Sequence, residues 1–113
     1  MGLKHLTEDQ VAAYARDGFL SPVTVMSEEE AAAYRARFEA AEAQWGAALD
    51  GRNRMNAHLI LPVLDELAHH PAILNAVEDL LGPDFLLNGS VLFIKEAGDP
   101  GFVSWHQDAR YVG

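Results

Sequence analysis

The spacing of apolar residues changes near residue 83, and this change constrains the fold more than any other feature of the sequence. Up to Gly82, apolar residues recur every three or four positions, which is typical of amphipathic helices. From Asp84 to Ile94 they follow a period of two, which predicts a long strand. A second strand is expected from Phe102 to Asp108, after a loop rich in Gly, Asp and Pro. Helices followed by strands place the chain in the α+β class.

Capping motifs predict where the helices begin and end. Thr7 is followed three residues later by Gln10, and Ser27 by Glu30, which is the pattern of a capping box. Prolines are favoured in the first turn of a helix, and glycines just after the last turn. Pro62 and Pro71 therefore predict two helix starts, and Gly18 and Gly82 two helix ends. The helix that follows Ser27 is expected to bury one face, which contains Ala31, Tyr34, Phe38, Ala41 and Trp45.

The composition argues against several classes of protein. The net charge is −9, and the eight Lys and Arg residues are not clustered, which argues against a nucleic-acid-binding surface. The absence of Cys excludes disulfides and thiolate metal sites. No apolar run approaches the roughly 20 residues of a membrane span, and the N-terminus does not resemble a signal peptide. We therefore expect a cytoplasmic protein with no nucleic-acid or membrane partner.

His106 and Asp108 are the residues that most directly suggest chemistry. On a strand, side chains two positions apart point to the same face, so the imidazole and the carboxylate are expected to lie side by side. They would supply two of the three ligands of a facial 2-His-1-carboxylate site, which binds non-haem Fe(II) and leaves positions open. A His hydrogen-bonded to an Asp at the surface is the alternative interpretation of the pair taken alone. The third ligand, a second His, is expected later in a longer protein.

The sequence around this pair resembles the phytanoyl-CoA dioxygenase family. The resemblance is carried by Leu92–Glu96, the Gly/Asp/Pro loop and Val103–Tyr111, and also by Pro71–Pro83, Leu6–Gln10 and Asp17–Leu20. It covers nearly all of this chain and about the first half of a typical family member. It implies a double-stranded β-helix core of the jelly-roll or cupin-like type, truncated here. Residues 1–113 would then be the N-terminal part of one oxygenase domain, with a helical layer over about 1–82 packed on the first core strands over about 84–113.

The resemblance implies an enzyme that uses Fe(II), 2-oxoglutarate and O₂ to hydroxylate a small organic substrate. His106 and Asp108 would be the iron ligands. Halogenating relatives have a small residue in place of the carboxylate, so Asp108 favours hydroxylation.

The resemblance also implies positions for the cosubstrate and the substrate. Contacts with 2-oxoglutarate fall near Arg54 and near Val91, and the backbone of Gln107 could line the same pocket. Tyr111 could reach the substrate, although an isolated aromatic residue is more often part of the packing.

A second hypothesis comes from a different class of protein. A strand at the end of a chain leaves an open sheet edge, and pairing of that edge with another copy would cover it. The chain could then be a non-catalytic fragment or truncated paralogue that acts as an oligomerising or interaction module. Taken alone, residues 1–113 are expected to be inactive. The adjacent His69 and His70 are expected to be structural, because neighbouring helical side chains diverge by about 100°.

Overall fold

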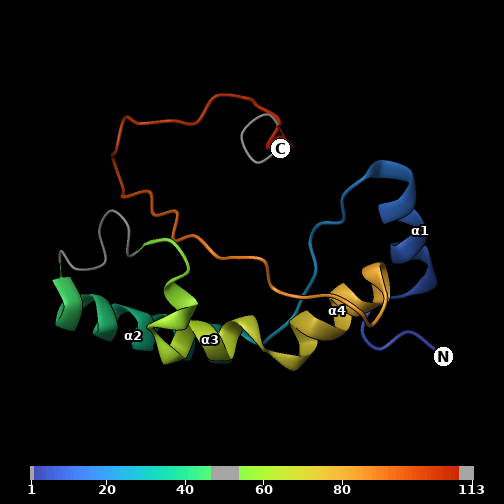
Figure 1. Cartoon of the computed structure of the whole chain (residues 1–113), viewed down its shortest axis with the longest axis horizontal. Coiled ribbons are helices and arrows are strands. Elements are labelled where there is room, and N and C mark those ends of the chain that lie inside the picture. Colours follow the sequence, from blue (N-terminus) through green and yellow to red (C-terminus); the bar gives the residue numbers. More distant parts are fainter. Residues whose placement is uncertain (1, 47–53, 110–113) are drawn as a thin grey trace.

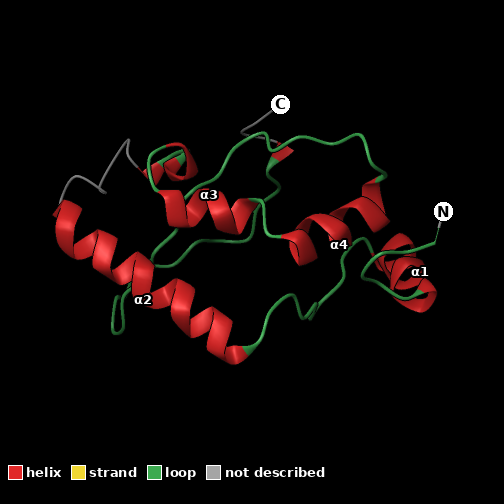
Figure 2. Ribbon diagram, turned by 90° about the horizontal axis from the view of Figure 1, so that it is seen from below, coloured by secondary structure: helices red, strands yellow, loops and turns green. Residues whose placement is uncertain are grey.

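A computed structural model of the chain describes residues 2–46 and 54–109, and these residues form helices joined by long irregular segments (Figure 2). The α-helices are α1 (Glu8–Asp17), α2 (Glu28–Trp45), α3 (Pro62–Ala68) and α4 (Pro71–Leu81), and the 3₁₀ helix η3 (Ala57–Leu59) precedes α3. Figure 1 shows α3 lying along α2, with α4 and α1 beyond it. The segment after α4 runs back past the helices and continues away from them (Figure 1).

The predicted helix boundaries are confirmed. Thr7 and Gln10 form the complete capping box of α1, and Gly18 ends this helix with a left-handed φ of 80°. Ser27 accepts a hydrogen bond from the Glu30 backbone N–H at the start of α2. Pro62 and Pro71 occupy the first turns of α3 and α4, and Gly82 caps the C-terminus of α4.

Leu61 and Val63, at the start of α3, form the centre of the hydrophobic core. Only 2% of Leu61 and 6% of Val63 are exposed. The partly buried side chains of Tyr34, Phe38 and Ala41 on α2 pack against them. The predicted apolar face of α2 is therefore confirmed at these three positions. It does not extend to Ala31 and Trp45, which are exposed because α3 covers only the middle of α2.

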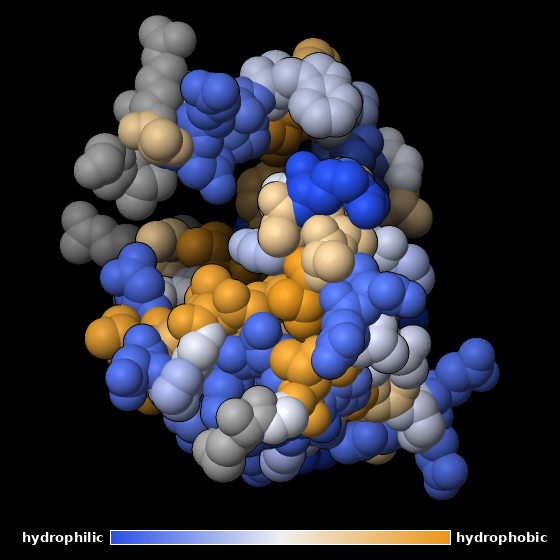
Figure 3. All heavy atoms as spheres, turned by 90° about the vertical axis from the view of Figure 1, so that its right-hand side faces the viewer, coloured by the Kyte–Doolittle hydropathy of each residue, from blue (hydrophilic) through white to orange (hydrophobic). Residues whose placement is uncertain are grey.

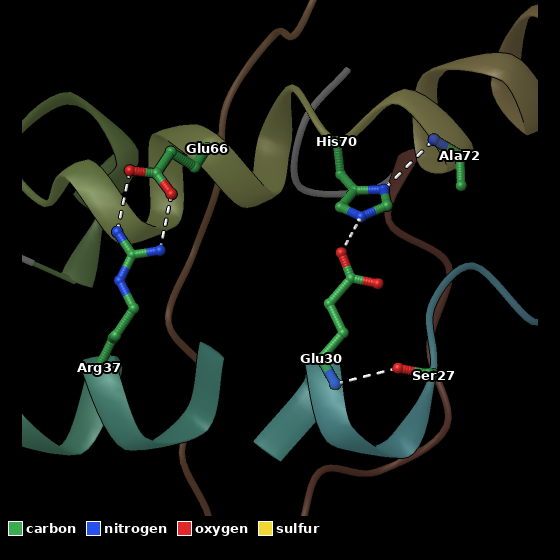
Figure 4. A network of polar contacts seen from close by, with 6 residues as sticks. All are labelled: Ser27, Glu30, Arg37, Glu66, His70 and Ala72. Carbon is green, nitrogen blue, oxygen red and sulfur yellow. Dashed lines mark hydrogen bonds and ion pairs between the residues drawn. The ribbon is translucent and has the colours of Figure 1, made fainter. Parts of the chain in front are cut away.

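Polar contacts also join α2 to the two helices that follow it (Figure 4). Arg37 donates two hydrogen bonds to Glu66, at 2.7 and 2.9 Å. His70 Nδ1 accepts a hydrogen bond from the Ala72 backbone N–H, so its proton is on Nε2 and is donated to Glu30 at 2.8 Å. His70 thus caps α4 and ties it to α2, which agrees with the structural role expected for this histidine.

The N-terminal segment is tied to α4 by a single carboxylate. The backbone N–H groups of Lys4, His5 and Leu6 each donate a 2.8 Å hydrogen bond to Asp79. Partial desolvation raises the pKa of Asp79, but these three donors and the charge of His5 outweigh it and lower the pKa below its usual value. Ionised Asp79 therefore holds Leu6, which is 6% exposed, in the small core.

The two predicted strands do not form in this structure. Within residues 2–46 and 54–109, the one β-type pairing is an isolated antiparallel bridge between Met55 and Val91. A strand is maintained by ladder hydrogen bonds to a neighbour, and residues 54–56 are the neighbour that the described chain provides for residues 90–92. The expected packing of helices on jelly-roll strands is consequently absent from the described residues.

The period of two is nevertheless visible in the burial of residues 90–95. Ser90, Leu92 and Ile94 are partly buried, whereas Val91, Phe93 and Lys95 are exposed. Alternate side chains of an extended segment point to opposite sides, so one side of this segment already faces the helices. The alternation in the sequence thus matches the direction of these side chains, although this segment does not belong to a regular sheet.

Many apolar side chains after α4 remain open to solvent. The exposed fraction reaches 82% for Leu86, 74% for Phe93 and 86% for Phe102. Apolar side chains are also open on the face shown in Figure 3. The radius of gyration is 16.4 Å, larger than the roughly 13 Å of a compact domain of this length. None of the helices in the described residues has the length and hydropathy needed to cross a membrane.

From the packing of the core we predict that substitutions of two nearby leucines lower the free energy of unfolding by different amounts. Leu61→Ala should lower the free energy of unfolding by about 3 kcal/mol, because it leaves a cavity beneath α2. Leu59→Ala is the matched control, since Leu59 is 75% exposed and its loss should cost less than about 0.5 kcal/mol. Urea unfolding followed by circular dichroism measures both values, and equal losses would contradict this description of the core.

Candidate metal centre

His106 and Asp108 converge although the predicted strand around them is missing. Nε2 of His106 lies 3.0 Å from Oδ1 of Asp108, and Nδ1 of His106 lies 2.8 Å from the Ser104 carbonyl oxygen. The short irregular segment from Ser104 to Asp108 therefore folds back on itself around the imidazole. The two side chains lie side by side, as the spacing predicted, but a local backbone contact orients the ring.

These two contacts restrict which ring nitrogens of His106 can carry a proton. A carbonyl oxygen can only accept, so Nδ1 of His106 carries a proton and donates it to Ser104. An ionised Asp108 also only accepts, yet it faces Nε2 at 3.0 Å. The contact is favourable only if Nε2 carries a second proton or if a cation takes the place of that proton. The pair is therefore the surface His–Asp hydrogen bond of the alternative interpretation, and a metal ion would bind here by taking the place of the Nε2 proton.

The electrostatics agree with this conclusion. The hydrogen bond to the Ser104 carbonyl is the largest cause that raises the pKa of His106 above its usual value. Desolvation lowers this pKa, and the hydrogen bond and charge of Asp108 raise it again. The site thus favours the protonated imidazolium, and a metal ion bound at Nε2 would have to displace that proton.

The separation of the two ligand atoms is also suitable for a metal. Two ligands at about 2.1 Å from a divalent ion, at a right angle to each other, are about 3.0 Å apart. A ring nitrogen that donates to a backbone carbonyl is the usual way in which a metal-binding imidazole is oriented. His106 thus has one nitrogen held by Ser104 and the other directed toward Asp108.

The pair lies in an open, shallow pocket. Val103, Ser104 and Trp105 complete its lining. Trp105 is fully exposed. In the parts of the chain that the structure describes, no three His, Asp or Glu side chains come together as a metal-binding group. His106 and Asp108 are accordingly two candidate ligands, and the described residues supply no complete metal-binding group.

Arg54 and Val91, the two positions expected near 2-oxoglutarate, are brought together by the fold. The Leu92 backbone N–H donates to the Arg54 carbonyl at 2.9 Å, and Met55 pairs with Val91 in the antiparallel bridge. Residues 37 positions apart in the sequence (54 and 91) are thereby held at neighbouring points of one paired segment. The pocket around His106 includes neither of them, so the structure contains two separate groups of candidate residues.

The remaining candidate residues are less well placed. Gln107 is exposed and lies between the two candidate ligands, so its backbone is close to the pocket. Tyr111, the expected substrate contact, lies outside the described residues.

Sequence reasoning missed the side chains that join the two halves of the paired segment. Asn56 and His58 both bind Ser90, which is more than 30 residues away. His58 has no partner at a local spacing, so no pattern in its neighbourhood indicated this contact.

Comparison with known proteins gives a consistent result. The family model described as phytanoyl-CoA dioxygenase (PhyH) matches residues 14–113. Two ectoine dioxygenases, from Bordetella parapertussis and Bordetella bronchiseptica, are each 30% identical over 118 aligned positions. The alignments cover 91% of this chain and 37% of each relative, so the chain spans little more than a third of the length of these relatives. No solved structure gives a significant match.

The contacts of His106 predict how its titration depends on Asp108. In Asp108→Asn the pKa of His106 should fall, because the negative charge that stabilises the imidazolium is removed. Since the folded-state pKa is raised, the protonated ring contributes stability at low pH, and this contribution disappears as the pH rises through that pKa. Imidazole chemical shifts recorded by NMR against pH measure the change. An unaltered His106 titration in Asp108→Asn would show that the contact is not formed in solution, and Asp65→Asn serves as the distant control.

Proposed function

Since this chain belongs to the phytanoyl-CoA dioxygenase family, we propose that it is part of an Fe(II)- and 2-oxoglutarate-dependent oxygenase that hydroxylates a small organic substrate. The observation that carries the proposal is the approach of His106 Nε2 to within 3.0 Å of Asp108 Oδ1, with the opposite ring nitrogen held by Ser104. Two further features support it: the pairing of Arg54 with the segment that contains Val91, and the names of the two dioxygenase relatives.

His106 and Asp108 would hold the metal through one neutral nitrogen and one carboxylate oxygen. The chemistry that bound iron would supply is the oxidation of a substrate C–H bond, with 2-oxoglutarate and O₂ as the other reactants. Ser104 would fix the ring so that its Nε2 lone pair remains directed at the metal. The carboxylate of Asp108 would offset part of the charge of the metal. The other metal and cosubstrate ligands would come from parts of the protein other than the described residues.

Arg54, Val91 and the backbone of Gln107 are the proposed contacts for 2-oxoglutarate. A guanidinium is the side chain best suited to bind a carboxylate, because it offers paired donors in one plane. Tyr111 is the proposed substrate contact. Ectoine, the compound in the names of the two relatives, is the first substrate to test. We also propose that the protein acts in the cytoplasm, without a nucleic-acid or membrane partner.

The alternative hypothesis, an interaction module without catalytic activity, is favoured by one observation. The segment after α4 exposes several large apolar side chains, among them Leu86, Phe93 and Phe102. Contiguous exposed apolar surface is typical of protein interfaces. A module of this kind would form a homo-oligomer through this segment and would not need His106 or Asp108.

Anaerobic addition of Fe(II) and 2-oxoglutarate to the full-length protein distinguishes the two hypotheses. An oxygenase site should give a visible metal-to-ligand charge-transfer band. His106→Ala and Asp108→Ala should each weaken metal binding by about tenfold or more, because a direct ligand is lost. His69→Ala is the control, since His69 also lies beside an aspartate, with Nδ1 3.4 Å from Asp65 Oδ1, and is also exposed to solvent.

Two outcomes would contradict the oxygenase proposal. One is a band of equal intensity in wild type and His106→Ala, which would place the metal elsewhere. The other is no band together with a dimer whose population rises with concentration in sedimentation experiments, which would support the interaction module.

A further inference from the structure

Ser90 is the residue through which the segment after α4 is attached to the turn before α3. Three of its polar groups make hydrogen bonds with this turn. Its carbonyl oxygen accepts from the Asn56 backbone N–H at 2.6 Å, its own N–H donates to Asn56 Oδ1 at 3.1 Å, and its hydroxyl lies 2.5 Å from His58 Nδ1. We refer to Asn56, His58, Gly89 and Ser90 as the clasp.

Asn56 is suited to its place in the clasp by its backbone conformation. Its φ is 55°, in the left-handed region that Asn tolerates better than most residues other than Gly. In this conformation both its N–H and its side-chain oxygen reach Ser90. A Gly at this position would keep the conformation and lose only the side-chain acceptor.

Gly89 shows how closely the two segments approach. A Cβ built on Gly89 would lie 3.0 Å from Asn56 Oδ1, which is too close for an ordinary contact. Residue 89 therefore has to be a glycine for Ser90 to reach Asn56 without displacement of the amide.

The clasp is anchored in the most buried part of the molecule. Ala57, between the two clasp side chains, is 1% exposed, and its carbonyl accepts from the backbone N–H of Leu61 at 2.9 Å. The hydrogen bonds of Ser90 thus fix the position of the next residue, Val91, relative to the core. Ser90 makes three of the hydrogen bonds between residues 54–58 and residues 90–92.

We infer that Asn56, His58 and Ser90 are positioning residues for 2-oxoglutarate: they fix the register between the segment of Arg54 and that of Val91, the two proposed contacts of this cosubstrate. This inference rests on the proposed function. A shift of one residue in the pairing would place Leu92 or Ser90 opposite Met55 and turn Val91 to the other side of the segment. The clasp prevents such a shift because the side-chain contacts of Ser90 cannot be made by either of its neighbours.

The experiment measures the affinity of the full-length, Fe(II)-loaded protein for 2-oxoglutarate by anaerobic titration calorimetry. Asn56→Gly and Ser90→Ala should each raise the dissociation constant by about tenfold, as is usual when a partner that orients a ligand-binding group is removed. Asn56→Asp keeps an acceptor oxygen and should stay within about threefold of wild type. In steady-state kinetics the loss should appear in the KM for 2-oxoglutarate and leave kcat nearly unchanged.

Amide hydrogen exchange supplies a readout that does not depend on the metal. The N–H groups of Ser90 and Leu92 should exchange faster in Asn56→Gly than in wild type, because their hydrogen bonds to the turn open more often. Ser27→Ala is the control for general destabilisation. It also removes one hydroxyl acceptor, but at the start of α2, and should leave the affinity for 2-oxoglutarate unchanged.

The outcomes separate this inference from the proposed function. If wild type binds 2-oxoglutarate, and Asn56→Gly opens the amides without loss of affinity, the positioning role is overturned and the oxygenase proposal stands. Equal losses in Ser27→Ala and Asn56→Gly would also overturn it, since general destabilisation would explain both. If wild type does not bind 2-oxoglutarate, the proposed function fails and the inference fails with it.

Discussion

The packing of Leu61 and Val63 against the middle of α2 is the interaction on which the rest of the structure depends. It sets α3 on α2 and, through the adjoining η3, buries Ala57. The turn that contains Ala57 then holds residues 90–92 by hydrogen bonds. A core of a few side chains thereby determines where a segment more than 30 residues away is placed.

The candidate metal ligands depend on a different kind of constraint. The core cluster and the lining of the pocket around them have no residue in common, and His106 is oriented by the carbonyl of Ser104, two residues away. Local hydrogen bonds of this kind can place two donor atoms side by side in an exposed segment, but they do not exclude water or supply a third ligand. In the proposed metal site, the remaining ligands would therefore come from residues other than those described.

Local signals predicted the helices well, because caps and first-turn prolines act through contacts within four residues. The closeness of His106 and Asp108 was also predicted from their spacing in the sequence, and it too depends on contacts within a few residues. The strands were predicted wrongly for this structure, because alternation fixes side-chain direction, whereas a strand also needs a paired neighbour. The contacts of Ser90 with Asn56 and His58 could not be predicted, since they join positions that only the folded chain brings together.

The central claim is that His106 and Asp108 bind one metal ion together. A crystal structure of the full-length protein grown anaerobically with Fe(II) tests it most directly. We predict an iron atom within about 2.2 Å of both His106 Nε2 and an Asp108 carboxylate oxygen, with Nδ1 still bonded to the Ser104 carbonyl. Iron bound at other residues, with His106 and Asp108 still joined by their direct hydrogen bond, would contradict it.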